Sequence, residues 1–161
     1  MTDRTDWTGA SIPATTLHIA QVRKLMISFA VDLIERSAIH DASKFDPVEQ
    51  GPLDELERIK AEQGEVTYGT PEYKERTKLL GPMIEHHYAN NSHHPEFHRE
   101  GIYGIDLLDL VEMVLDWVAA GKARNPDGVV RMQYALTNYD VSPMLTAVIQ
   151  NTYDRMGVKY V

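Results

Sequence analysis

The sequence of 161 residues contains no cysteine. This absence excludes disulfide bonds, thiolate zinc sites and cysteine nucleophiles, so a metal site would have to use His, Asp or Glu side chains. The sequence also lacks an apolar run of the roughly 18 residues that cross a bilayer, and its first residues lack the basic and then apolar pattern of a secretory signal. We therefore expect a cytoplasmic protein without a membrane partner.

Basic residues are in the minority, with 16 Lys and Arg against 24 Asp and Glu, which gives a formal net charge of −8. This balance argues against a broad electrostatic surface for DNA, RNA or anionic lipid. It does not argue against a small anionic substrate, which local cations can bind. The sequence leaves open whether copies assemble into a homo-oligomer.

Strand patterns are nearly absent as well, since no segment of five or more residues alternates convincingly between apolar and polar side chains. Apolar residues instead recur at three- and four-residue steps, and Pro, Gly and capping residues mark helix ends. Asp46 and Glu49 have the spacing of a capping box at one helix start. We predict an all-α fold of five to seven helices in one domain over residues 14–161, after a flexible segment over residues 1–13. The predicted helices cover about residues 15–37, 47–63, 71–80, 82–89, 105–120 and 143–156.

Histidine is concentrated in one window, because five of the seven histidines lie within residues 86–98. Imidazole nitrogens bind several divalent metals, and histidine pairs on both sides of a short turn, here at residues 90–92, can converge on one ion. The window therefore predicts a metal site, with His98 at its periphery. Helix phase favours His87 over His86 as a ligand, but a Gly-Pro break blurs this phase and leaves His86 open. The choice between His93 and His94 stays open as well.

His40 and Asp41 directly follow the first predicted helix. At a helix end the backbone can turn both side chains to one side, so that they bind one metal. The alternative is that His40 complements the helix C-terminus and Asp41 caps a turn. His18 lies on the apolar stripe of the same helix, where a hydrogen-bonded core histidine is the alternative to a ligand.

Three acidic side chains share one face of the predicted helix over residues 105–120, opposite an apolar face. No Lys or Arg on this helix precedes Lys122, so we expect the acidic face to meet cations in the interior instead of solvent. The three residues are Asp109, Glu112 and Asp116.

The order of these features resembles the HD superfamily of metal-dependent phosphohydrolases. Residues 40–44, HDASK, are similar to the HDxxK form of its motif, and residues 93–96, HHPE, are similar to the HHE segment of the HD-GYP phosphodiesterases, whose complete GYP signature is missing here. The strings HDASKF, HHYANNSHHPEFH and DLLDLVEMVLDW resemble more closely a family of small phage and bacterial proteins with an HD-like core. For a phage protein the expected location is the host cytoplasm.

The resemblance implies one or two divalent metal ions as cofactors, without distinguishing Mn, Fe, Zn, Co and Mg. The implied ligands are His18, His40, Asp41 and Asp109 for the core ion, with Asp106 as a competitor of Asp109, and His87 and His94 for a second ion. The other expected roles are catalysis for Lys44 and Glu112, and substrate binding for Lys44, His86 and His93.

We expect these residues to hydrolyse a nucleotide, a deoxynucleoside mono- or triphosphate, through a metal-activated water. Two alternatives belong to other classes of protein. One is a di-iron oxygenase on the same helical scaffold, which would contain iron and depend on oxygen. The other is a binding protein in which metal only holds the helices together, and which would turn over no phosphate ester.

Overall fold

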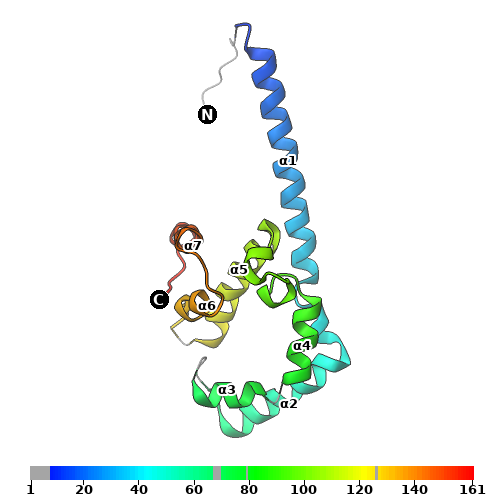
Figure 1. The fold of residues 1–161 in the computed structure, drawn as a ribbon, viewed down its shortest axis with the longest axis vertical. Helices are drawn as coiled ribbons and strands as arrows, with labels where there is room; N and C mark the ends of the chain where they lie inside the picture. The colour runs from blue at the N-terminus through cyan, green and yellow to red at the C-terminus, as the bar shows by residue number, and fades with distance from the viewer. Residues whose placement is uncertain (1–7, 67–69, 79, 126) are drawn as a thin grey trace. The chain divides into compact units, whose positions relative to one another are not determined.

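The computed structural model describes residues 8–66, 70–78, 80–125 and 127–161. Within these residues the regular structure is helical, which confirms the predicted all-α fold (Figure 1). An isolated bridge between Val130 and Tyr160 is the only β-pairing in the described part of the chain. The helices are α1 (Ile12–Ile39), η1 (Ala42–Phe45), α2 (Pro47–Gln63), α3 (Pro71–Lys78), α4 (Gly81–Asn90), η2 (Pro95–Phe97), η3 (Gly101–Gly104), α5 (Leu107–Arg124), α6 (Met132–Asn138) and α7 (Pro143–Met156), where η marks a 3-10 helix.

Most helix boundaries follow the local sequence signals. The Ser142 side chain caps α7 by accepting a hydrogen bond from the Leu145 backbone N–H at 3.3 Å, and Gly157 ends this helix in the left-handed conformation, with φ 66°. The predicted interruption before Pro82 is confirmed, because α3 ends at Lys78 and α4 begins at Gly81. Capping chemistry and the backbone limits of proline and glycine are local, so the sequence reports them reliably.

Two local predictions fail. The capping box at the start of α2 is wrong: Asp46 occupies the N-cap position, but its side chain makes no capping hydrogen bond within the described residues. Glu49 is instead completely buried and contacts histidines of α4. The sequence does not predict α6 either, because this helix spans only seven residues, too few to show a clear period.

The chain divides into two compact units, Met1–Ile39 and His40–Val161. The single domain predicted over residues 14–161 stays a prediction. Of the segment expected to be flexible, residues 1–7 lie outside the described residues, and α1 begins at Ile12. Among the described helices, none combines the length and the hydropathy of a membrane span.

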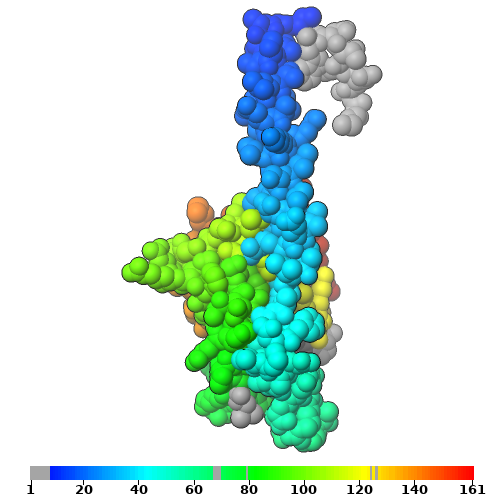
Figure 2. Space-filling model, turned by 90° about the vertical axis from the view of Figure 1, so that its right-hand side faces the viewer, coloured from blue at the N-terminus to red at the C-terminus, as the bar shows by residue number. Residues whose placement is uncertain are grey.

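In the His40–Val161 unit, apolar side chains of α5, α6 and α7 pack in one core. Tyr153 of α7 is 0% exposed, and its hydroxyl donates a hydrogen bond to the Val114 carbonyl oxygen of α5 at 2.7 Å. Elsewhere in this unit α2 and α4 lie side by side, drawn in cyan to teal and in green in Figure 2. The buried residues of the core are Ile102, Met113, Val114, Val118, Val130, Met132, Leu136, Ile149 and Tyr153.

We expect Tyr153→Phe to lower the free energy of unfolding by about 1 kcal/mol, because it removes a buried hydrogen bond while keeping the packed ring. Urea unfolding followed by circular dichroism measures this change. Tyr103→Phe is the matched control, since Tyr103 is 72% exposed. Equal stability of the two variants would contradict a role for the buried hydroxyl.

Candidate metal centre

The turn that contains His40 and Asp41 forms the first part of the site. Asp41 adopts a left-handed backbone conformation with φ 56°, which Asp and Asn tolerate better than most other residues. The turn brings the two side chains together, as expected, and places His40 Nε2 3.4 Å from Asp41 Oδ2.

The histidine window supplies the second part. Because α4 ends at Asn90 and the chain then turns, His87 near the helix end and the histidines after the turn approach Asp41. Four residues each offer one ligand atom here, and these atoms lie within 4.8 Å of one another. We call them the His₃Asp group: Asp41, His87, His93 and His94.

The separations within the His₃Asp group fit a small cation. His87 Nε2 lies 3.0 Å from His94 Nε2 and 3.4 Å from Asp41 Oδ1. His93 Nε2 lies 3.5 Å from the same Asp41 oxygen. A tetrahedral ion with bonds of about 2.1 Å holds its ligand atoms about 3.4 Å apart. These three separations lie near that value, and the remaining ligand atoms of the group are at most 4.8 Å apart.

Two atoms of the His₃Asp group are buried without a hydrogen-bond partner in the described structure, Asp41 Oδ1 and His93 Nε2. A buried polar atom left unsatisfied costs about 1–3 kcal/mol. The two atoms face each other, and a cation between them would satisfy both. The donor set of three imidazoles and one carboxylate suits Zn, Fe, Mn or Co better than Mg, which prefers oxygen ligands.

Two of the three acidic residues of α5, Glu112 and Asp116, lie beside the histidines of this site. Glu112 Oε1 lies 2.7 Å from His40 Nδ1 and 3.1 Å from His93 Nδ1. A carboxylate at Nδ1 favours the tautomer that leaves Nε2 free to bind a metal. His40 Nε2 in turn lies 3.7 Å from Asp116 Oδ1, so His40, Asp41 and Asp116 form a second group able to hold an ion. His40, His93 and Glu112 form a third such group, and Asp41 belongs to the first two.

The two groups that contain Asp41 differ in protonation. Burial lowers the pKa of His94 to about 3, so this imidazole is neutral at pH 7 and has a lone pair for a metal. Hydrogen bonding to Asp116 raises the pKa of His40 to about 9, so His40 carries a proton that an ion would have to displace. Burial raises the pKa of Asp41, but the hydrogen bond and charge of Lys44 outweigh it and lower the pKa below its ordinary value. The His₃Asp group is therefore better prepared to bind a metal ion than the group of His40, Asp41 and Asp116.

Some residues that the sequence predicts for the site make hydrogen bonds outside the metal-ligand groups. Asp109 is buried, and its Oδ1 accepts a hydrogen bond from the Ser92 hydroxyl at 2.6 Å. Asp109 belongs to none of the metal-ligand groups among the described residues. Its competitor Asp106 is the exposed N-cap of α5 and accepts a hydrogen bond from the Asp109 backbone N–H. His98 is outside these groups too, with Nε2 2.7 Å from the Ser92 carbonyl oxygen.

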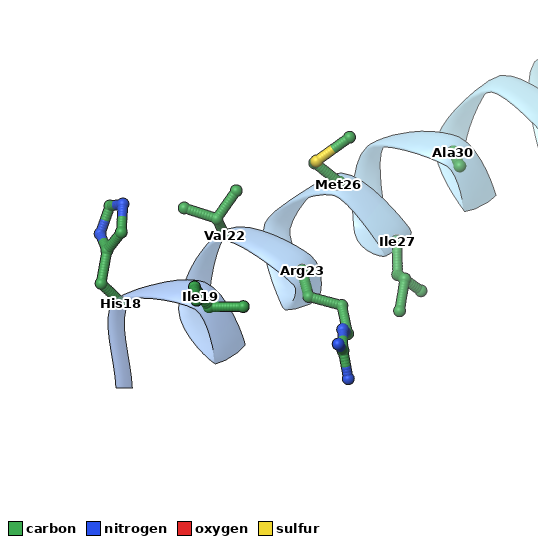
Figure 3. Close-up of a pocket in the computed structure, with 7 residues that line it drawn as sticks. All are labelled: His18, Ile19, Val22, Arg23, Met26, Ile27 and Ala30. Carbon is green, nitrogen blue, oxygen red and sulfur yellow. The ribbon is translucent and has the colours of Figure 1, made fainter. Parts of the chain in front are cut away.

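His18 lies in the Met1–Ile39 unit, whose position relative to the His40–Val161 unit the structure does not fix. Its assignment as a ligand therefore stays a prediction. A close-up of a pocket along α1 shows His18, Val22 and Met26 projecting from the same side of the helix (Figure 3), in agreement with the predicted stripe.

Lys44 contacts the His₃Asp group directly, whereas His86 is linked to it through Glu49. Lys44 forms an ion pair with Asp41, and its side chain is 37% exposed. His86 is half-buried and places Nδ1 2.7 Å from Glu49 Oε1. Both residues keep a route to solvent, which a substrate-binding role requires.

No site role is predicted for Glu49 from the sequence, and Asp116 is predicted only to lie on an acidic helix face. For Asp116 the signal was present, because the helix phase already placed it beside Glu112. For Glu49 the spacing after Asp46 matched a common capping pattern, so no sequence signal separated the two roles.

Comparison with known protein families shows to which family the chain belongs. The model of a family of unknown function, DUF5662, matches residues 9–155, which is most of the chain. The chain belongs to this family. No curated protein and no solved structure matches it. Because the function of DUF5662 is unknown, membership in it implies no activity. The function proposed below therefore depends on the geometry of the site.

Proposed function

We propose that this DUF5662 protein is a metal-dependent phosphohydrolase that acts on a nucleotide, either a deoxynucleoside mono- or triphosphate. The observation that carries the proposal is the pair of buried atoms without a hydrogen-bond partner, Asp41 Oδ1 and His93 Nε2, within a group of three imidazoles and one carboxylate. A protein interior tolerates such atoms where a ligand completes them. A divalent cation is the ligand that this donor set fits.

A bound divalent ion would lower the pKa of a water toward about 7 and polarise a phosphoryl oxygen. The chain's own residues would do the rest. Asp41, His87, His93 and His94 hold the ion, which moves His93 from the substrate-binding role expected from the sequence to a ligand role. Glu112 orients the imidazoles through Nδ1 instead of moving protons.

Lys44 is the residue suited to the substrate phosphate. Its ammonium group lies at Asp41, beside the His₃Asp group, and part of its side chain reaches solvent. A phosphate that approaches the ion from this side would meet a positive charge, and a preorganised cation stabilises the charge that develops in phosphoryl transfer. The resemblance to the HDxxK motif supports the same role.

The first test is metal analysis of protein purified without a histidine tag, followed by a nucleotide hydrolysis screen with Mn, Co, Mg and Zn. We expect at least about one metal ion per chain, and we expect the release of phosphate to depend on the metal. Protein that binds none of these metals would disprove the proposal. Protein that binds metal but releases no phosphate would favour a purely structural metal.

We expect Lys44→Ala to keep the metal and to lower turnover about 100-fold, because it removes phosphate stabilisation without removing a ligand. Metal content and kcat measured on the same sample separate the two effects. Lys78→Ala is the control, since Lys78 also forms an ion pair with the acidic residue three positions before it, Glu75, at an exposed site. Unchanged turnover in Lys44→Ala would remove the role assigned to Lys44.

A di-iron oxygenase is the second candidate. It is favoured by the sharing of Asp41 between two ligand groups, which is how a carboxylate bridges two metals. Two irons per chain, visible absorption and oxygen consumption would support it. Zinc or manganese with phosphate release would exclude it.

A further inference from the structure

Glu49 has an unusual environment for a carboxylate. It lies in the first turn of α2, on the part of the helix that packs against α4, and it is 0% exposed. Both of its oxygens contact histidine: Oε1 lies 2.7 Å from His86 Nδ1, and Oε2 lies 2.9 Å from His87 Nδ1. A buried charge is costly unless it is paired and hydrogen-bonded. The two histidine contacts, together with a hydrogen bond from the Ser43 side chain, account for its placement and lower the pKa of Glu49.

The contact with His87 determines which ring nitrogen can bind a metal. An ionised carboxylate only accepts hydrogen bonds, so His87 must carry its proton on Nδ1. In the neutral ring Nε2 then has the free lone pair. This atom is the one that lies 3.0 Å from His94 Nε2 and 3.4 Å from Asp41 Oδ1.

Two other polar groups approach His87 Nδ1 but do not replace Glu49. The Asn91 amide nitrogen lies 3.2 Å away, yet its two hydrogens are directed to the Ser43 hydroxyl and the His87 carbonyl oxygen, both at 2.7 Å. The Ser43 hydroxyl lies 3.4 Å from Nδ1, farther than Glu49. Glu49 is therefore the acceptor that defines the tautomer of His87.

We propose that Glu49 is a positioning residue of the metal centre, which holds His87 in the Nδ1–H tautomer and so presents Nε2 to the His₃Asp group. The proposal rests on the proposed metal site. Glu49 touches neither ion nor substrate in this role. Carboxylates that orient a ligating histidine typically contribute 10- to 100-fold to metal affinity.

The tautomer can be observed directly in the metal-free protein. Proton–nitrogen correlation spectra of the histidine side chains, recorded well above the ordinary histidine pKa, report which ring nitrogen carries the proton. The His87 signals are assigned by their loss in His87→Ala. We expect the Nδ1–H tautomer, and an Nε2–H tautomer for His87 would overturn the proposal.

Cobalt(II) titration of variants then tests the consequence for metal binding. We expect Glu49→Met to weaken Co²⁺ binding about 10- to 100-fold, because it removes the accepting oxygen. Glu49→Gln keeps one accepting oxygen, which can still serve His87, so it should bind Co²⁺ more tightly than Glu49→Met. Glu55→Met is the matched control on the exposed side of α2 and should bind Co²⁺ like the unmodified protein.

These outcomes separate positioning from a merely structural role. If Glu49→Met folds with reduced thermal stability but binds Co²⁺ normally, the proposal is overturned and Glu49 only supports packing. Equal loss in Glu49→Gln and Glu49→Met would also overturn it, because the site would then need the charge and not the accepting oxygen. Failure of the unmodified protein to bind Co²⁺ would instead remove the proposed metal site itself. If Glu49→Met does not fold, the tautomer spectrum of the unmodified protein decides.

Discussion

Replacing Asp41 with Asn is expected to empty the proposed metal centre and abolish the proposed hydrolysis. Asp41 supplies Oδ1 to the His₃Asp group and belongs also to the group that contains His40 and Asp116. Asn keeps the size of the side chain and tolerates the left-handed backbone, with φ 56°, but removes the negative charge that balances the cation. We expect metal affinity to fall more than about 100-fold, beyond the loss typical of a residue that only orients a ligand. Metal analysis by mass spectrometry and phosphate release measure the two effects.

Asp140→Asn is the matched control for Asp41→Asn. Asp140 is the other described residue besides glycine with a positive φ, 51°, and it is exposed and outside the metal-ligand groups. The control should keep metal content and activity, and both variants should keep the helical circular dichroism spectrum. Full metal content in Asp41→Asn would show that the His₃Asp group is not the metal site.

Removal of His94 is expected to have the second largest effect, whereas removal of His98 should leave metal binding intact. His94 is a neutral imidazole beside His87, and His94→Ala deletes one of four ligand atoms from the His₃Asp group. We expect metal affinity to fall by about 100-fold or more. His87→Ala should act in the same direction. Metal stoichiometry and cobalt titration on these variants provide the measurement.

His98→Ala serves as the comparison within the same histidine window. The Ser92 carbonyl oxygen only accepts hydrogen bonds, so His98 donates to it through Nε2, which also lies 3.6 Å from Asp109 Oδ2. His98 belongs to none of the candidate metal-ligand groups among the described residues. We expect a loss of about 1 kcal/mol in the free energy of unfolding and normal metal content. If metal were lost in His98→Ala but not in His87→Ala or His94→Ala, His98 would be the ligand, and the assignment of His87 and His94 would be wrong.

Parts of the site could be predicted because they depend on adjacent residues or on helix phase. His40 and Asp41 are neighbours, so one turn suffices to bring them together, and His87 follows the inward side of α4. The three acidic residues of α5 share a face for the same geometric reason. The sequence could not say which of them meets the histidines, because Asp109 and Asp116 stand about 10 Å apart along the helix axis. The described structure places Glu112 beside His40 and His93, and Asp116 near His40. Asp109 instead accepts a hydrogen bond from the Ser92 hydroxyl and lies 3.6 Å from His98 Nε2.

The sequence by itself determined the helical class, most helix ends and the residue types available for a metal, because propensity, capping and composition act locally. Only the tertiary structure decided how those residues are used. Glu49 has the spacing of a capping residue, yet the packing of α2 against α4 buries it beside His86 and His87, where two imidazole N–H groups replace the backbone as its partners. The assembly of Asp41 with His93, 52 positions later, likewise depends on packing between distant segments. Local chemistry sets what a side chain can bind, and burial with long-range neighbours sets what it does bind.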